Sequence, residues 1–402
     1  MIYSTNMDSY SIYLHVPFCK HRCAYCDFNT YAGLDGLIPN YTYALCREIE
    51  YSAASGELRS VHTVFFGGGT PSLLPAHAIG ELLTALDRSF ALSVDLEITL
   101  EANPGTLSFE YLNTLRQLGV NRLSLGMQSA NAEELRLLER EHDQRDVIQA
   151  VSWARRAGFE NLNLDLIFGL PYQQMDNWKQ SLTLAVDLHP EHLSLYALTL
   201  EHGTPIQKWA GRGLISEPDA DLAAEMYEWA GEFLESKGYG QYEISNWARK
   251  DANGKLMVCR HNEQYWRCQP YLGFGAGAHG YAEGFRIANV LSPAVYIERM
   301  QPRNSEVLLD FPRTPATTSA VKIDREMEMN EVMMMGLRLT ELGVSRADFQ
   351  TRFGEALEDV YGCQISKLVG LGLLERYGEA QDALRLTKPG RLLGNQVFIE
   401  FV

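Results

Sequence analysis

The chain has 402 residues, long enough for two or three domains at roughly 150 residues each, and its 46% hydrophobic and 21% charged residues are typical of a folded globular protein. It carries 51 Asp and Glu residues and 35 Lys and Arg residues, which gives a net charge of −16. This charge argues against a nucleic-acid-binding surface and against a basic surface that binds anionic membranes. No apolar run reaches the ~18 residues of a spanning helix, and the N-terminus lacks a secretory signal pattern. These features predict a soluble, cytoplasmic protein.

The first half alternates short apolar runs with amphipathic helical segments. The predicted strands are Ser11–Val16, Val61–Phe66, Leu96–Glu101, Arg122–Gly126, Asn161–Ile167 and Leu193–Leu198. The predicted helices are Tyr41–Ser52, Ala78–Phe90, Phe109–Leu118, Ala132–Glu139, Arg145–Ala157 and Met175–Asp187. About six such repeats indicate a parallel sheet and favour an α/β fold of the incomplete β/α barrel type, with a flavodoxin-like sheet as the alternative. In a barrel, functional residues are expected at the carboxyl ends of the strands.

The pattern changes after Asp219. The predicted elements are a helix at Leu222–Lys237, a short strand at Tyr242–Trp247, a connection at Gln301–Ala320, helices at Arg325–Leu339, Arg346–Phe353 and Leu357–Leu368, and a hairpin formed by Leu373–Tyr377 and Leu384–Leu386. Helices followed by a hairpin predict a small α+β, winged-helix-like module. We therefore expect a partial barrel at residues 1–235, a connecting region at 236–310 and a C-terminal module at 311–402.

Three of the seven cysteines lie close together directly after the first predicted strand, as Cys19, Cys23 and Cys26. Three thiolates spaced C-x3-C-x2-C can hold three irons of a 4Fe–4S cluster and leave the remaining iron without a protein ligand. Structural zinc would need a further ligand, which His15 or His21 could supply, so zinc stays open at this point. Unrelated core cysteines are the third alternative.

This cysteine loop resembles that of the radical SAM superfamily, in which S-adenosylmethionine (SAM) chelates the open iron. The glycine-rich run Phe65-Phe66-Gly67-Gly68-Gly69-Thr70-Pro71 follows the second predicted strand, where the superfamily binds the methionine part of SAM. Glycines there let the backbone approach a ligand closely. The resemblance implies SAM contacts at Tyr13, Tyr25, Gly68, Gly69, Thr70, Glu101, Gln128, Arg140 and Asp165. Without it, each polar side chain among these is a cap, a surface ion pair or a satisfied buried group.

Within the superfamily, the chain resembles the branch that contains oxygen-independent coproporphyrinogen III oxidases and the related HemW-type haem chaperones. The phrases that carry this resemblance are Tyr13 to Cys19, Leu123 to Gln128 and Asp165 to Pro171. The oxidases have a further Cys two residues after the third, where this chain has Phe28. The oxidases also have an N-terminal extension, whereas Tyr13 lies near the start of this chain. Both departures favour the chaperone branch.

A second motif, Cys259-Arg260-His261-Asn262-Glu263-Gln264-Tyr265-Trp266, matches the His-Asn-x-x-Tyr-Trp motif that the chaperone branch associates with haem. A His can ligate haem iron, and Tyr and Trp can flank a porphyrin face. The resemblance implies haem contacts by His261, Tyr265 and Trp266, with Cys259 and His279 as rival ligands. The alternative is a core Tyr–Trp pair with a satisfied histidine. His279 lies in a glycine run without the βαβ context of a dinucleotide loop.

Two functions follow from the resemblance. In the first, the protein binds haem as cargo and delivers it to apo-haemoproteins such as respiratory-chain enzymes, and the cluster and SAM serve dimerisation, gating or release. In the second, it is an oxidase-type enzyme that uses a 5′-deoxyadenosyl radical to decarboxylate coproporphyrinogen III. We expect the first, without coproporphyrinogen III dehydrogenase activity. A homodimer and a peripheral contact with a membrane remain open.

Overall fold

The computed structural model describes residues 9–54, 56, 58–302, 309–378 and 381–402. The chain forms two compact units: unit 1 is Met1–Ala230 with Pro270–Lys322, and unit 2 is Gly231–Gln269 with Ile323–Val402. This division differs from the three consecutive domains expected from the sequence, because region 236–310 is shared between the units. The physical reason is that strands after residue 270 join the sheet of unit 1. Among the described residues, no helix is long and apolar enough to cross a membrane.

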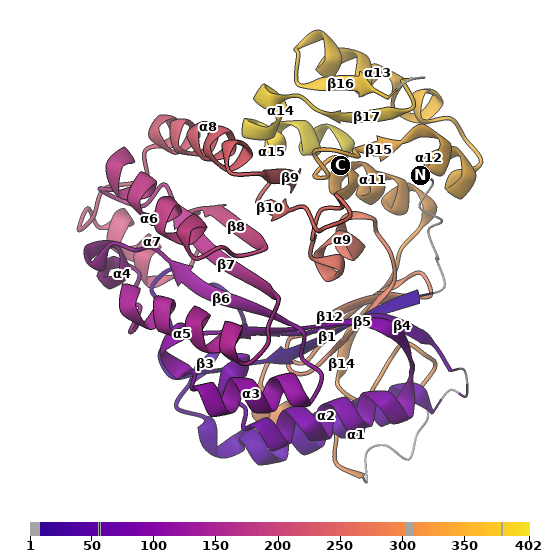
Figure 1. Ribbon diagram of the computed structural model, residues 1–402. Helices are drawn as coiled ribbons and strands as arrows, with labels where there is room; N and C mark the ends of the chain where they lie inside the picture. The colour runs from indigo at the N-terminus through magenta and orange to yellow at the C-terminus, as the bar shows by residue number, and fades with distance from the viewer. Residues whose placement is uncertain (1–8, 55, 57, 303–308, 379–380) are drawn as a thin grey trace. The chain divides into compact units, whose positions relative to one another are not determined.

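Parallel strands form the centre of unit 1, in the order β1-β4-β5-β6-β7-β8, and the helices that follow them lie outside the curve of the sheet (Figure 1). The strands are β1 (Ser9–Val16), β4 (Ser60–Gly68), β5 (Ala91–Ala102), β6 (Arg122–Gln128), β7 (Asn161–Phe168) and β8 (His192–Ala197). The helices are α1 (Ile38–Ala53), α2 (Ala76–Ser89), α3 (Phe109–Gln117), α4 (Ala132–Leu137), α5 (Gln144–Arg156), α6 (Met175–Asp187) and α7 (Pro205–Gly211). The predicted partial barrel is confirmed.

Successive side chains of these strands point to opposite faces of the sheet. The face toward the helices is apolar: Leu14, Leu123 and Leu164 are fully buried there. The other face is polar, and Arg122 and Asn163 are buried on it. The sheet thus has an apolar outer face for packing and a polar inner face that leads to the strand ends.

Strands that the sequence did not predict extend this sheet beyond β1. They are β11 (Tyr271–Phe274), β12 (His279–Ala282), β13 (Phe285–Asn289) and β14 (Thr317–Lys322). β11 pairs with β1 in parallel, and β12, β13 and β14 follow as an antiparallel meander. The expected connection at Gln301–Ala320 is therefore wrong at its end, where β14 begins.

Glu48 of α1 holds this returning segment in place. Its buried carboxylate accepts hydrogen bonds from the Gly275 N–H at 2.8 Å, Asn289 Nδ2 at 2.8 Å, the Tyr296 hydroxyl at 2.6 Å and the Thr314 hydroxyl at 2.7 Å. Tyr296 lies on α10 (Pro293–Arg299). Burial raises the pKa of Glu48, and the four donors act against that shift.

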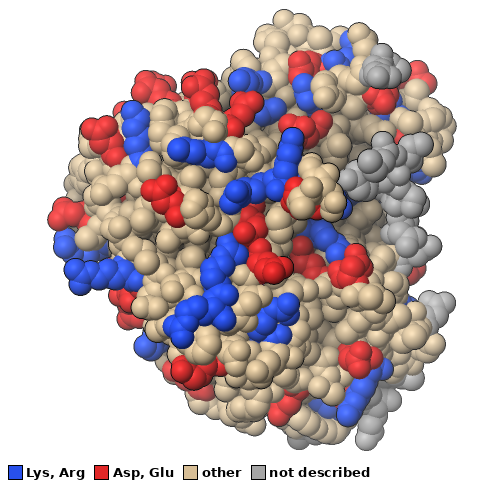
Figure 2. Space-filling model, viewed as in Figure 1, with Lys and Arg blue, Asp and Glu red and all other residues tan. Residues whose placement is uncertain are grey.

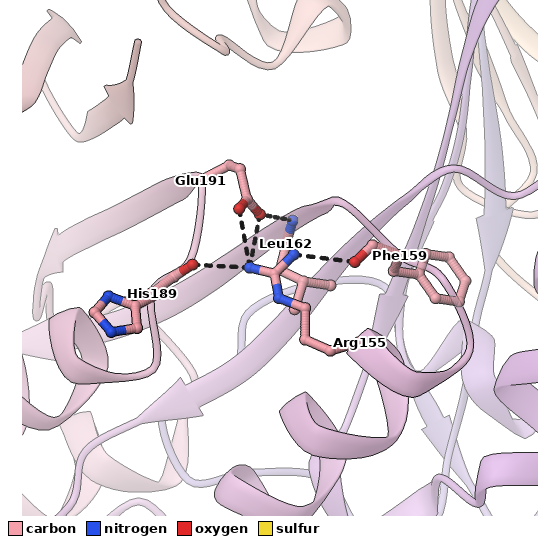
Figure 3. Close-up of polar contacts among 5 residues, drawn as sticks. All are labelled: Arg155, Phe159, Leu162, His189 and Glu191. Atoms are coloured by element: carbon pink, nitrogen blue, oxygen red, sulfur yellow. Dashed lines mark hydrogen bonds and ion pairs between the residues drawn. The ribbon is translucent and has the colours of Figure 1, made fainter. Parts of the chain in front are cut away.

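At the amino ends of β7 and β8, Arg155 of α5 joins the two strands (Figure 3). Its guanidinium donates to the carbonyls of Phe159 at 3.0 Å and His189 at 2.8 Å, and to both oxygens of Glu191 at 3.0 and 2.9 Å. Glu191 also accepts the Leu162 N–H at 2.9 Å. A single guanidinium nitrogen of Arg155 thus contacts both oxygens of Glu191, and the ion pair holds together the end of the sheet opposite the cysteine loop.

Unit 2 is a helical module with antiparallel strands. Helix α8 (Ala220–Ser236) spans the boundary between the units, and β9 (Tyr239–Glu243) and β10 (Asn246–Arg249) form a hairpin where the sequence suggested one strand. The remaining elements are α9 (Arg260–Trp266), α11 (Arg325–Gly336), β15 (Val344–Ser345), α12 (Arg346–Phe353), α13 (Leu357–Gly370), β16 (Leu374–Tyr377), β17 (Ala383–Leu386), α14 (Lys388–Leu392) and α15 (Gly394–Phe398). The predicted hairpin is confirmed as β16–β17. The hydrophobic core of unit 2 includes Met333, Phe349, Ile365 and Leu386.

Acidic and basic side chains are interspersed on the face shown in Figure 2, although the whole chain carries a net charge of −16. Many of the surface charges pair locally, as Arg136 does with Glu133 at 3.1 Å on α4. Such exposed pairs contribute little to stability, about 0–1 kcal/mol.

Candidate functional site

The three clustered cysteines lie at the carboxyl end of β1. Cys19 ends the short strand β2 (Phe18–Cys19), which pairs with β3 (Tyr31–Ala32), and Cys23 and Cys26 lie on the loop between them. Cys19 is buried, the other two are half-buried, and none is in a disulfide. The loop is anchored by the Ala24 N–H, which donates to the Leu138 carbonyl at 3.2 Å. The sequence thus places three free thiols on one braced loop.

Each of these sulfurs has a hydrogen-bonding neighbour. The Thr70 hydroxyl lies 3.6 Å from the Cys19 Sγ, Arg140 Nη1 lies 3.5 Å from the Cys23 Sγ, and the Thr30 hydroxyl lies 3.8 Å from the Cys26 Sγ. Burial raises the pKa of Cys19 and of Cys26, and the hydroxyl neighbours oppose that shift. A cation and donors beside thiolates suit the anionic sulfurs of an iron–sulfur cluster. The donor set therefore fits a 4Fe–4S cluster held by these three residues.

The zinc alternative lacks its extra ligand. Both ring nitrogens of His15 are engaged, Nδ1 with the Tyr13 hydroxyl at 3.1 Å and Nε2 with the Asn29 carbonyl at 2.9 Å. His21 is exposed and lies 3.5 Å from Glu139. Among the described residues, no three His, Cys, Asp or Glu side chains form a group that could hold a single metal ion.

The glycine-rich loop packs directly on the cysteine loop. The Gly69 N–H donates to the Val16 carbonyl and the Thr70 N–H to the Phe18 carbonyl, both at 2.8 Å. A Cβ on Gly69 would lie 2.6 Å from the Phe18 oxygen and 3.0 Å from the Cys19 Sγ, and Gly68 has φ +113°. Only glycine fits at these two positions.

Two buried carboxyl groups, Glu101 near the end of β5 and Asp165 on β7, lie on the polar face of the sheet. Glu101 accepts the Gly68 N–H at 3.1 Å, and burial, with the nearby Asp165, raises the pKa of Glu101 to about 8. Asp165 accepts from the Ser124 hydroxyl at 2.9 Å and from Asn163 Nδ2 at 2.7 Å, and burial also raises its pKa. The positive charge of Arg122 opposes both pKa shifts, and a cationic ligand group would be attracted to these carboxyl groups in the same way.

Gln128 and Arg140 meet at the end of β6. Arg140 Nη2 donates to the Gly126 carbonyl at 2.8 Å, and a Cβ on Gly126 would lie 2.9 Å from Gln128 Nε2 and 3.1 Å from Arg140 Nη2. Gln128 has φ 62°, a left-handed conformation that is uncommon for a non-glycine residue. Within the described residues, the buried Nε of Arg140 has no hydrogen-bond partner. An unpaired guanidinium N–H and a strained polar residue at one strand end are typical of a ligand site.

Tyr13 and Tyr25 complete the group of SAM-site residues. Tyr13 stacks on Phe65 at 6.2 Å between ring centroids, and Tyr25 packs against Leu138 and Ile167. Although burial acts in the opposite direction, Tyr25 and Cys23 raise the pKa of Arg140. The structure thus brings all the residues that the resemblance implied for the cluster and SAM to one rim of unit 1.

A cavity of about 220 Å³ opens beside this rim, lined among others by Cys23, Thr70 and Arg140. His142, also in its lining, was not singled out from the sequence. Its Nε2 lies 3.0 Å from the Met127 carbonyl, and burial, with the nearby Arg140, lowers its pKa to about 4. His142 lies two residues before α5, and this position gives no local signal that its side chain lines the cavity.

The His-Asn-x-x-Tyr-Trp residues lie apart from the rim residues in sequence and belong to unit 2. His261 is only 1% exposed, and its Nε2 lies 2.9 Å from the Tyr265 hydroxyl. Cys259 is fully buried. Trp266 lies under the Arg338 guanidinium, 4.4 Å from the ring centroid, and Arg338 pairs with the buried Glu243 at 2.6 Å. These side chains form a packed cluster around α9.

His279, the remaining haem candidate, lies in unit 1 and is exposed on β12. The structure therefore places the haem candidates in two different units, with His261 and Cys259 buried and His279 open to solvent.

Comparisons with known proteins identify the superfamily and the fold. A family model described as the radical SAM superfamily matches residues 13–185, and one described as the HemN C-terminal domain matches residues 323–393. Among solved structures, coproporphyrinogen III oxidase (HemN) from Escherichia coli aligns with a TM-score of 0.81 at 22% identity, over 99% of this chain and 91% of that chain. This likeness shows the shared fold.

Curated relatives are similar over nearly the whole chain. "Heme chaperone HemW" of Bacillus subtilis is 37% identical over 393 residues, which is 98% of this chain and 99% of the relative. The mitochondrial "radical S-adenosyl methionine domain-containing protein 1" of Mus musculus is 38% identical, over 90% of this chain and 81% of the relative. The chain therefore belongs to the HemW family of the radical SAM superfamily.

Proposed function

We propose that this protein binds haem and delivers it to apo-haemoproteins such as respiratory-chain enzymes, and that its barrel rim holds a 4Fe–4S cluster and SAM. The observation that carries the proposal is the full-length likeness to relatives named haem chaperones, at 37% identity. Phe28 supports it, because this side chain is 62% exposed where the oxidases have a further Cys. A phenyl ring can neither ligate iron nor exchange a proton.

Cys19, Cys23 and Cys26 would hold the cluster, and the rim would hold SAM beside it. When both are bound, a reduced cluster can supply the electron that cleaves SAM, and in this proposal the cluster and SAM serve dimerisation, gating or release of haem. The paired Glu101 and Asp165 carboxylates attract the SAM ammonium group, and Arg140 attracts its carboxylate. The glycine loop lets the backbone reach the methionine part.

The direct test is to reconstitute the cluster anaerobically and to measure three properties of the same preparation. They are haem affinity, transfer of haem to an apo-haemoprotein, and conversion of coproporphyrinogen III with SAM and a reductant. We expect haem binding and transfer without decarboxylation. Steady formation of protoporphyrinogen would instead show the oxidase reaction, and failure to bind haem would contradict the chaperone role. The triple Cys→Ala variant is the control for the dependence of each property on the cluster.

The candidate ligands of haem iron are His261 and its rivals Cys259 and His279, and Tyr265 and Trp266 are the candidates for contact with the porphyrin. They differ in access, because haem iron needs a ring nitrogen or thiolate that can reach it.

We also propose that two copies of the chain form a homodimer, and gel filtration of the cluster-loaded protein with and without haem tests this. A mass that stays monomeric in both conditions would contradict it.

A further inference from the structure

His279 lies on an open face of the sheet formed by β11, β12, β13 and β14. In the register of these strands, Tyr13 pairs with Gly273, and His279 pairs with Ala288, which pairs with Ser319. A Cβ on Gly273 would collide with the His279 carbonyl, so β11 and β12 also lie side by side at this level. Directly opposed residues point to the same face. The imidazole is therefore surrounded in its row by small residues.

The next row along the same face carries larger groups. This row consists of Tyr281 on β12, Arg286 on β13 and Val321 on β14, which pair with one another. Each lies two residues along its strand from the member of the first row, which is His279, Ala288 or Ser319. Residues two apart on a strand share a face. Arg286 is exposed and Val321 is 50% exposed, while Tyr281 is half-buried. One face thus presents an imidazole, a phenol ring, an aliphatic side chain and a guanidinium.

The site of His279 also adjoins the rim. Burial lowers the pKa of His15, the hydrogen bond to the Asn29 carbonyl opposes that shift, and a positive charge on His279 lowers it further. The two imidazoles are therefore close enough to interact electrostatically. His15 in turn contacts Gly68, because a Cβ there would lie 2.6 Å from its Cε1. His15 thus interacts with His279 and also contacts the glycine loop of the proposed SAM site.

Resting on the haem-binding function proposed above, we infer that His279 is the residue that ligates haem iron, with the macrocycle lying on the β11–β14 face and Arg286 facing a propionate. A face of four strands spans about 15 Å, at roughly 4.8 Å between neighbours, which is enough for a planar macrocycle. An exposed imidazole is a common haem ligand, and guanidinium groups bind carboxylates in a planar geometry. Ligation on an open face leaves the haem accessible to an acceptor.

In this assignment His261 is a buried structural residue of the α9 cluster in unit 2. Its ring is 1% exposed, lies edge-on to Tyr265 at 5.1 Å between centroids, and has its Nε2 against the Tyr265 hydroxyl. To bind iron, the ring would have to leave this buried pair, and the Tyr265 hydroxyl would lose this partner. His279 needs no such rearrangement.

The experiment is a haem titration of the cluster-loaded protein and of single variants. His279→Ala should weaken haem binding more than about tenfold and remove the histidine-ligation signature from resonance Raman and EPR spectra. His261→Ala should retain that signature. His202→Ala, which removes another exposed histidine of unit 1, is the matched control and should behave as the wild type. Metal-free protoporphyrin, which needs no axial ligand, should bind wild type and His279→Ala alike.

Iron content and circular dichroism show whether each variant is folded. If His279→Ala keeps the wild-type affinity and spectrum, the assignment is overturned, whichever other residue proves to be the ligand. In that case the proposed function stands, because haem still binds. If the wild type itself does not bind haem, the proposed function fails, and the assignment of His279 fails with it. Arg286→Glu should weaken haem binding but not binding of the haem dimethyl ester, and equal loss for both would refute the propionate contact.

Discussion

The buried charged side chains at the two ends of the parallel strands in unit 1 differ in how completely they are paired. At the amino ends, Arg155 and Glu191 satisfy each other and the neighbouring backbone, so that folding alone completes the group. At the carboxyl ends, Glu101 and Asp165 are buried beside each other with raised pKa values, and Arg140 keeps a buried N–H without a partner within the described residues. The first arrangement stabilises the fold, and we propose that the second is completed by a bound ligand.

The largest expected effect is at the carboxyl ends. Replacing Cys19, Cys23 and Cys26 together by Ala should abolish iron and sulfide incorporation, because the loop then has no thiolate ligand. Cys363→Ala, which removes an exposed cysteine of unit 2, is the matched control and should retain full incorporation. Iron and sulfide assays after anaerobic reconstitution measure the result. Wild-type content in the triple variant would refute the cluster assignment.

The next effect is on stability at the amino ends. Arg155→Ala should lower the free energy of unfolding by about 2–4 kcal/mol, since it removes several hydrogen bonds and leaves the Glu191 carboxylate, 17% exposed, without its cation. Urea unfolding measures the change. Arg136→Ala, which breaks an exposed pair, should cost no more than about 0.5 kcal/mol. Cluster content and SAM affinity should not change in either variant; a loss of SAM affinity in Arg155→Ala would show that the two ends are coupled.

A smaller effect, on binding, is expected from Glu101→Gln. Removing this carboxylate should weaken SAM binding by about tenfold, a loss of roughly 1.4 kcal/mol, because the ammonium group loses an ionic partner. Isothermal titration of the cluster-loaded protein with SAM measures the affinity. In the wild type, affinity should fall as the pH decreases below about 8, where Glu101 takes up a proton. An affinity in Glu101→Gln equal to wild type at pH 9 would exclude a role for this residue in SAM binding.

The same residue predicts how stability depends on pH. Burial raises the pKa of Glu101 from its ordinary value of 4.5 to about 8 in the fold, so the folded chain binds more protons between these pH values. The free energy of unfolding should therefore fall as pH rises from about 5 to 8, and the fall should be smaller in Glu101→Gln. Urea unfolding of the SAM-free protein at pH 6 and pH 9 tests this. Identical slopes in wild type and variant would contradict the burial of an ionisable carboxyl at this position.

The smallest effect is expected at Phe28. Phe28→Ala should change the free energy of unfolding by no more than about 0.5 kcal/mol and leave iron content unchanged, because the ring is 62% exposed. Iron assays and urea unfolding measure both. A loss of iron in this variant would show that the ring shields the cluster, and the reading of Phe28 as a mere replacement of the oxidase Cys would be wrong.

Local patterns predicted most of the fold. The strand–helix alternation gave β1 and β4 to β8, and the C-terminal helices and hairpin followed from periodicity and turns. The strands β11 to β14 were not predicted, because each is only four to six residues long and β11 is stabilised by pairing with the distant β1. The role of Glu48 was not predicted for a similar reason. Its hydrogen-bond donors come from residues more than two hundred positions away, and no local sequence signal marks them.

The same distinction applies to the site. The cysteine and glycine loops are continuous motifs, so their residues and spacing were visible in the sequence. His261 was expected as the first choice for contact with haem iron, but a motif does not show burial, and the ring lies inside the α9 cluster. The structure favours His279 as the iron ligand because the sheet places it on an open face beside small residues, which the sequence alone does not show.

The measurement that tests the ligand site most directly is Mössbauer spectroscopy of the ⁵⁷Fe-reconstituted protein with and without SAM. Three thiolate ligands leave one iron of a 4Fe–4S cluster open, and we expect SAM to coordinate it. Addition of SAM should then shift the isomer shift and quadrupole splitting of a single iron site and leave the rest of the spectrum unchanged. A spectrum that is identical with and without saturating SAM, or one that lacks the signals of a 4Fe–4S cluster, would contradict this assignment of the rim.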